Sequence, residues 1–313
     1  MARLKVVIDT DPGQDDAVAI LLALAERDRL DLLGLTTVAG NVPVERTTIN
    51  ALRMIELAKR SDVPVFRGAS RPLLRPLRTA EFINGPDGLD GAGLPAPKLA
   101  ARETHAVAFL LETLRATEDR SITLCPLGPL TNIALAFAQA PELAAKVERI
   151  VLMGGARDLG NVTPSAEFNI FVDPHAAAIV LGLGVKIVMF GLHATHQAMA
   201  TPERVAKVTA LGTDVARSVT GMLGRPRPGG LAKFGVPGHP LHDPCVIAWL
   251  LWPELFQGRD CHVAVETASE AAIGRTIIDW WGQQKLTPNA HVIDRIDAEA
   301  LFDRLPKSLA RLG

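Results

Sequence analysis

The sequence lacks the features that mark several large classes of protein. It has three cysteines in 313 residues and no CxxC pair, which argues against a disulfide scaffold and a zinc ribbon. No apolar run reaches the roughly 18 residues that a membrane-spanning helix needs. No leader precedes the first predicted strand, so we expect a cytoplasmic protein with no membrane partner. The net charge of -1 gives no support for nucleic-acid binding.

Common catalytic motifs are absent as well. The chain has no GxGxxG after its first predicted strand, and no GxxxxGK[ST], HExxH or GxSxG. A nucleotide-cofactor enzyme and a serine hydrolase therefore have no support. Tyrosine is also missing, so any substrate pocket must do without it.

An acidic turn near the N-terminus is the most informative feature that is present. A short apolar run predicts a buried strand, an apolar run from Ala17 to Ala25 predicts a buried helix, and four aspartates fall between them within eight residues: Asp9, Asp11, Asp15 and Asp16. Charges about 4 Å apart interact by roughly 1–4 kcal/mol, and a bound divalent cation relieves that repulsion. Hard cations such as Ca²⁺ and Mg²⁺ take oxygen ligands of this kind. Helix capping would explain one or two of these acids, not four.

Strand-like and helix-like runs alternate through the first two thirds of the chain. We expect strands at Leu4–Ile8, Leu32–Val38, Val63–Phe66, Ile122–Cys125, Arg149–Met153 and Val185–Phe190. We expect helices at Asp15–Arg27, Val44–Arg60, His105–Ala116, Pro129–Ala138 and His175–Leu183, and a long loop over residues 67–102. This repeat predicts an α/β fold, a mostly parallel Rossmann-like sheet with helices on both faces.

The last third is less regular. It predicts a helix at Pro202–Leu223, a glycine- and proline-rich flap at Gly224–His242, a helix at Cys245–Leu251, a small antiparallel pair at Cys261–Glu266 and Arg275–Trp280, and a terminal helix at Asp297–Leu305. No shift in composition marks a boundary, so we expect one domain over residues 1–313.

Polar residues follow the predicted strands at their carboxyl ends, where ligands bind in such sheets. Two amides and a carboxylate in one loop, Asn161, Glu167 and Asn169, suit the hydroxyls of a sugar, and an ordinary polar turn is the alternative. The neighbours His242 and Asp243 could pair a proton donor with a metal ligand. The alternative there is a helix cap beside a solvent-facing histidine.

Taken together, these segments resemble the inosine–uridine-type nucleoside hydrolases. The resemblance rests on the opening signature Asp9–Asp16 and on further blocks in the same order: Ala39–Asn41, Leu127–Asn132, Met153–Gly155, Asn161–Asn169 and His242–Pro244. It covers nearly the whole chain, and it implies a small-molecule nucleoside substrate, a role in purine or pyrimidine nucleoside salvage, and a homodimer or homotetramer.

The resemblance also implies the roles of individual residues. It implies one Ca²⁺ that also binds the ribose 2′- and 3′-hydroxyls and one water, with these ligands: the carboxylates of Asp11, Asp15, Asp16 and Asp243 and the backbone carbonyl of Thr131. Asp11 would take a proton from that water, which attacks C1′ through an oxocarbenium-like transition state. His242 would protonate the departing base or stack on it. Substrate contacts are implied at Asn41, Asn84, Met153, Asn161, Glu167, Phe168 and Asn169. Asp9 would orient its neighbours.

Two departures from the family pattern bear on the substrate. Asn84 stands where many members have a histidine, and an amide cannot act as an acid. Pyrimidine-preferring members often use tyrosines and an arginine on the flap, whereas this flap has no tyrosine and offers Arg225, Arg227, Lys233, Phe234 and His239, so the base preference stays open. The alternatives are a ribose or nucleoside binder without turnover and a Mg²⁺-dependent phosphatase built on Asp9 and Asp11. The phosphatase leaves Asp15 and Asp16 without a role.

Overall fold

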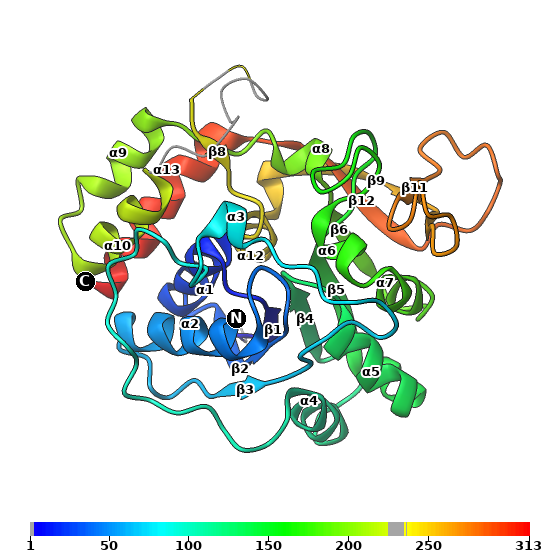
Figure 1. The fold of residues 1–313 in the computed structure, drawn as a ribbon, viewed down its shortest axis with the longest axis horizontal. Coiled ribbons are helices and arrows are strands. Elements are labelled where there is room, and N and C mark those ends of the chain that lie inside the picture. The colour runs from blue at the N-terminus through cyan, green and yellow to red at the C-terminus, as the bar shows by residue number, and fades with distance from the viewer. Residues whose placement is uncertain (1–2, 225–234, 236) are drawn as a thin grey trace.

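The fold is organised around an eight-stranded sheet, seen in the computed structural model of residues 3–224, 235 and 237–313. The strand order is β3-β2-β1-β4-β5-β6-β12-β9 (Figure 1). The strands are β1 (Leu4–Thr10), β2 (Leu30–Thr37), β3 (Val65–Arg67), β4 (Ile122–Pro126), β5 (Val147–Met153), β6 (Ile187–Phe190), β9 (Phe256–Cys261) and β12 (Ala290–Ile296). Every neighbouring pair is parallel except β12 with β9. The predicted mostly parallel sheet is confirmed.

Helices cover both faces of the sheet (Figure 1). Each face has its own hydrophobic core. One face carries α1 (Gln14–Ala25), α2 (Val44–Leu57), α9 (Pro202–Thr209), α10 (Asp214–Leu223), α12 (Pro244–Leu251) and α13 (Ala298–Leu309). The other carries α4 (Ala106–Arg115), α5 (Thr131–Gln139) and α7 (Pro174–Leu181). Strand β1 serves both cores, because successive side chains point to opposite faces: Val6 and Ile8 join the first core and Val7 the second.

Helix α1 is buried along its whole length, since every one of its 12 residues is buried. It packs between the sheet and helices α2, α10, α12 and α13. Its few polar residues, Gln14, Asp15 and Asp16, are confined to the first turn. A helix that is apolar on all sides is stable only in such a position, and this position holds its acidic end at the sheet edge.

The structure corrects several expectations. The helix predicted at Pro202–Leu223 is two helices, α9 and α10, and the break contains Gly212 at a φ of +67°. The predicted loop over residues 67–102 contains a short helix, α3 (Glu81–Asn84). Strands β9 and β12 and the short helices α6 (Phe168–Val172) and α8 (Leu192–Thr195) were not predicted. The terminal helix runs on to Leu309.

The smaller elements complete the fold. The predicted antiparallel pair is confirmed as a hairpin of β10 (Val263–Val265) and β11 (Thr276–Ile278), with Cys261 in β9 instead. A second short pair joins β7 (Met199–Ala200) to β8 (His239–Pro240). Short 3₁₀ helices lie at η1 (Pro141–Lys146), η2 (Pro253–Leu255) and η3 (Ala310–Leu312). Most of the predicted flap, residues 225–234 and 236, lies outside the described residues. Among the residues that are described, no helix is long and apolar enough to cross a membrane.

The order of the strands predicts where a ligand would bind. The chain order reverses between β1 and β4, and in open parallel sheets ligands bind beyond the carboxyl ends of the strands at such a point. Asp9 and Asp11 stand at that end of β1, and the segment from β4 to Thr131 lies beside them.

Candidate active site

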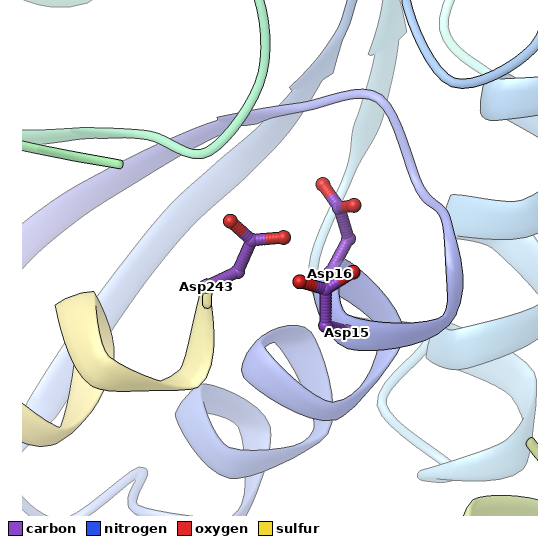
Figure 2. A group of neighbouring side chains, drawn as sticks. All are labelled: Asp15, Asp16 and Asp243. Atoms are coloured by element: carbon purple, nitrogen blue, oxygen red, sulfur yellow. The ribbon is translucent and has the colours of Figure 1, made fainter. Parts of the chain in front are cut away.

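Three carboxylates from two distant segments meet at this edge of the sheet. Asp15 and Asp16 come from the first turn of α1, and Asp243 comes from the start of α12 and points toward them (Figure 2). One oxygen from each lies within 4.8 Å of the others, and all three residues are buried. Two oxygens on opposite sides of a Ca²⁺ ion lie at most about 5 Å apart. This group could therefore hold a metal ion.

Asp11 lies beside these three and is itself fully buried. Its Oδ2 accepts a hydrogen bond of 2.6 Å from the backbone N–H of Asn41, while its Oδ1 accepts none from the described residues. Two glycines make room for this carboxylate. A Cβ on Gly40 would lie 2.1 Å from Oδ2, and one on Gly128 would lie 2.2 Å from Oδ1. The backbone thus fixes Asp11 and leaves one oxygen available.

Asp16 is held much more tightly than Asp11. Its Oδ1 accepts hydrogen bonds from the Thr10 hydroxyl at 2.5 Å and from the Asp11 backbone. Its Oδ2 accepts from the backbone of Gly13 at 3.1 Å and from the Asn41 side chain at 3.2 Å. The bond from Gly13, the N-cap residue of α1, is the helix-capping role considered above, so Asp16 caps the helix as well as facing Asp243. Asp243 caps α12 by position, but its side chain accepts no capping bond from that helix among the described residues.

Burial makes the acidic cluster electrostatically costly. Desolvation raises the pKa of Asp11 and of Asp243 well above the usual value, and the charge of Asp16 adds to both shifts. Desolvation and the charge of Asp15 raise the pKa of Asp16 to about 6. Buried acids of this kind stay ionised only when a counter-charge is present, and otherwise they take up protons. The donor set, which is all oxygen with the Oδ1 of Asp11 unsatisfied, fits a hard divalent cation.

Asp9 lies outside the group that could hold the ion. Its Oδ1 accepts hydrogen bonds from the Thr36 hydroxyl at 2.6 Å and from the Asn132 side chain at 2.8 Å. Burial raises the pKa of Asp9 to about 7, against the effect of these two bonds. The orienting role expected for Asp9 stays a prediction.

Residues of the predicted sugar loop gather where β4 and β5 end. The Asn169 side chain donates to the carbonyl of Leu127 at 2.6 Å and to that of Met153 at 3.2 Å. Glu167 accepts three backbone N–H bonds, two of them as the N-cap of α6. Burial raises the pKa of Glu167 to about 7. Asn161 is exposed and accepts from the backbone of Phe168 at 2.9 Å. The loop therefore has the structure of a capped polar turn as well as polar groups for a ligand.

Two further expected substrate contacts have partners inside the protein. Phe168 packs in a small apolar cluster with Ala80 and Val172. Asn84, at the end of α3, is buried and donates to the Asn41 side chain at 2.9 Å. Asn41 in turn donates hydrogen bonds to Asp11 and Asp16. Asn84 is therefore linked to the acidic cluster through Asn41.

His242 is partly exposed next to the acids. Its backbone N–H donates to Asp15 at 3.3 Å, and its Nδ1 lies 2.7 Å from the Thr195 hydroxyl. The ring of His196 is 5.7 Å away, centroid to centroid. The contact of Nδ1 with Thr195 fixes the orientation of the imidazole ring.

Sequence reasoning did not identify four side chains that fix the expected site residues: Thr10, Asn132, Asp173 and Thr195. Thr10 and Asn132 lie inside the segments that resemble the family, Asp9–Asp16 and Leu127–Asn132, so the sequence could have identified them as residues of the site. Asp173 before Pro174 has the pattern of a helix N-cap, which it is. The contact of Thr195 with His242 has no signal in the sequence, because the two are 47 residues apart.

Comparisons with known proteins agree with this geometry. Residues 6–303 match the model of the family described as inosine-uridine preferring nucleoside hydrolase. The chain is 48% identical to the pyrimidine-specific ribonucleoside hydrolase RihA of Shewanella sp. strain MR-7 over 97% of this chain and 96% of that one. It is 46% identical to an uncharacterised protein of Schizosaccharomyces pombe over 99% of this chain and 100% of that one.

Solved structures give the same result. A purine-preferring ribonucleoside hydrolase from Gardnerella vaginalis superposes with a TM-score of 0.90 at 29% identity, covering 98% of both chains. A plant nucleoside hydrolase superposes with a TM-score of 0.89 at 31% identity, covering 99% of both. The chain is therefore an enzyme that belongs to the nucleoside hydrolase family.

Proposed function

We propose that this enzyme hydrolyses the N-glycosidic bond of ribonucleosides to ribose and free base, with Ca²⁺ as its cofactor. The observation that carries the proposal is the buried acidic cluster, in which Asp15, Asp16 and Asp243 converge beside an unsatisfied oxygen of Asp11. A cluster of this kind needs a counter-charge, and Ca²⁺ takes six to eight oxygen ligands in flexible geometry. The ligands would be the four carboxylates and the carbonyl of Thr131.

Different residues around the proposed ion would carry out different parts of the reaction. A bound Ca²⁺ would supply charge for holding the ribose hydroxyls and for lowering the pKa of a water. Asp11 would accept the proton of an attacking water, and the support is that Asn41 fixes one of its oxygens while the other accepts no hydrogen bond from the described residues. The buried carboxylates also favour the positive charge that develops on the sugar. His242, with Nδ1 held by Thr195, would protonate the leaving base.

The sugar loop would hold the ribose. Asn169 would bind the ring hydroxyls, and Asn161 and Glu167 the 5′-hydroxyl, with Met153 and Phe168 lining the pocket. Asn169 is the best supported of these, because two backbone carbonyls already fix the orientation of its amide. Asn41 and Asn84 would support the acids on the other side.

We further propose a preference for pyrimidine ribonucleosides. Its support is that relatives 45–48% identical to this chain are named pyrimidine-specific, whereas the purine-preferring structure is only 29% identical. A cytoplasmic homodimer or homotetramer is proposed on the family resemblance alone. Light scattering on the purified chain measures the assembly.

One assay tests the reaction, the metal and the base together. The metal-free chain is incubated with uridine, cytidine, inosine and adenosine, and released reducing sugar is measured with a chelator, with Ca²⁺ and with Mg²⁺. We expect sugar release that needs Ca²⁺ and is fastest with the pyrimidines. Asp243→Asn should abolish it, whereas Asp62→Asn, an exposed acid paired with Arg60, should not. Tight binding without sugar release would indicate a binder, and phosphate release from a monoester would indicate a phosphatase.

A further inference from the structure

Asp173 is a buried carboxylate that the reaction described above does not use. It is 1% exposed and stands between α6 and α7. Its two oxygens accept three hydrogen bonds from three separate segments of the chain. A carboxylate held in this way is a strong local anchor, because hydrogen bonds to a charged group are stronger than those between neutral groups.

The first of these segments is the start of α5. The Thr131 hydroxyl donates to Oδ2 of Asp173 at 2.8 Å. The next residue, Asn132, is held from the other side by Asp9 at 2.8 Å and by the carbonyl of Thr37 at 3.0 Å. The side chains of the first two residues of α5 therefore fix its first turn. This turn bears the carbonyl that is proposed as a metal ligand.

The second segment is the pair of helices that contains Asp173. Its Oδ1 accepts from the backbone of Ala176 at 3.0 Å and so caps α7. Asp173 also directly follows the short helix α6, which carries Asn169. Any shift of Asp173 would move this helix and the amide that we assign to the ribose.

The third segment is the loop that follows β3. The backbone N–H of Leu73 donates to Oδ2 of Asp173 at 2.9 Å. Farther along the same loop, the guanidinium carbons of Arg75 and Arg78 lie 4.6 Å and 5.5 Å from the centroid of the Phe171 ring. The loop therefore packs against α6 and contacts Asp173 as well.

We propose that Asp173 is a positioning residue that sets the Thr131 carbonyl and α6 in a single geometry, and that its bond to Thr131 raises the affinity for Ca²⁺. The inference rests on the proposed function, in which the Thr131 carbonyl is a ligand. A carbonyl brings no net charge to the ion, so its contribution depends on where the backbone holds it. Residues that orient metal ligands change metal affinity by about 10- to 100-fold when they are altered.

The test is calorimetric titration of Ca²⁺ into the metal-free full-length chain. Thr131→Val removes the hydroxyl and keeps the carbonyl, and we expect its Kd for Ca²⁺ to rise about tenfold or more. Thr131→Ser keeps the hydroxyl and should restore most of the affinity. Ser308→Ala is the matched control, because it removes a buried hydroxyl bond of 2.6 Å to Glu26 at the remote helix α13. We expect Ser308→Ala to lower the melting temperature but not the affinity for Ca²⁺.

A second variant separates the expected effect on Ca²⁺ binding from the expected effect on substrate binding. Asp173→Asn replaces one acceptor oxygen by a donor, which opposes the backbone N–H of Leu73 or that of Ala176 according to the orientation of the amide. We expect it to weaken Ca²⁺ binding and also to raise KM for uridine at saturating Ca²⁺, whereas Thr131→Val should change KM much less under that condition. Thr131→Ala gives the same measurement if the valine variant does not fold.

These measurements distinguish a wrong role for Asp173 from a wrong proposed function. Wild-type chain that takes up no Ca²⁺ would overturn the metal assignment itself. Wild-type chain that binds Ca²⁺, together with Thr131 variants of unchanged affinity, would leave the hydrolase standing and refute the role of Asp173. Weakened binding in Ser308→Ala as well would show that general destabilisation, not positioning, causes the loss.

Discussion

Removal of the metal ion should make the stability of this protein fall as the pH rises. Asp9 and Asp16 have pKa values of about 7 and about 6 in the folded chain, raised mainly by burial from 3.8. The folded state therefore binds more protons than the unfolded state between these values. Stability that is present below the unfolded pKa is lost as the pH rises through the folded pKa.

The size of the effect follows from the two shifts. One pKa unit corresponds to about 1.4 kcal/mol. Between pH 5 and pH 8, Asp9 and Asp16 together would lower the free energy of unfolding by about 4 kcal/mol. Asp11 and Asp243, whose pKa values burial also raises, act in the same direction. Domains are stable by only about 5–15 kcal/mol, so this loss is a large share of the total.

Urea denaturation at pH 5, 6, 7 and 8, with chelator and with excess Ca²⁺, measures the effect. We expect the gap between the two curves to widen with pH, because the proposed Ca²⁺ would bind the ionised form of the acids. Glu167, whose pKa burial raises, and His193, whose pKa burial lowers, titrate with and without the ion, so the comparison largely removes them. Asp16→Asn should reduce the pH dependence of the chelated chain, and Asp62→Asn should not. Chelated chain that is as stable at pH 8 as at pH 5 would refute this account.

Three further predictions concern turnover. Asp11→Ala should lower kcat by about 10²–10⁴-fold while ribose binding partly survives; unchanged kcat would remove Asp11 as the base. His242→Ala should slow uridine hydrolysis far more than that of p-nitrophenyl riboside, whose leaving group needs no proton, and equal losses on both would argue against a leaving-group acid. Gly128→Ala puts a Cβ 2.2 Å from Oδ1 of Asp11, so we expect a loss of about 100-fold in kcat, as for small displacements of reacting groups. A folded Gly128→Ala variant with wild-type kcat would show that this oxygen does not take part.

Much of the fold could be predicted because the parallel strands are short, apolar and separated by amphipathic or apolar helices. The strands that were missed lack this pattern. In β9 the four central residues, Gln257–Asp260, are exposed at the edge of the sheet. In β12 the apolar residues alternate with His291, Asp294 and Arg295. The break between α9 and α10 was missed because both helices are amphipathic, so apolar spacing alone shows no interruption there.

The acids of the site could be predicted because they are close together in sequence and of one chemical type. Their supports could not, because hydrogen bonds join residues far apart in the chain. Asp173 reaches Thr131 across 42 positions and Leu73 across 100. No local pattern encodes those distances, and only the sheet order brings the segments together.

Two carboxylates of the acidic turn, Asp16 and Asp11, differ in how many of their oxygens already accept hydrogen bonds. Asp16 has both oxygens occupied by four donors, so its position is fixed whether or not an ion is present. Asp11 has one oxygen fixed and one unsatisfied, and both lie against glycines where a Cβ would clash with the carboxylate. A base must present a lone pair in a fixed direction while keeping it free of competing donors. Of these two carboxylates only Asp11 meets both conditions, so the reaction should depend on its neighbours Gly40, Asn41 and Gly128 as much as on the carboxylate itself.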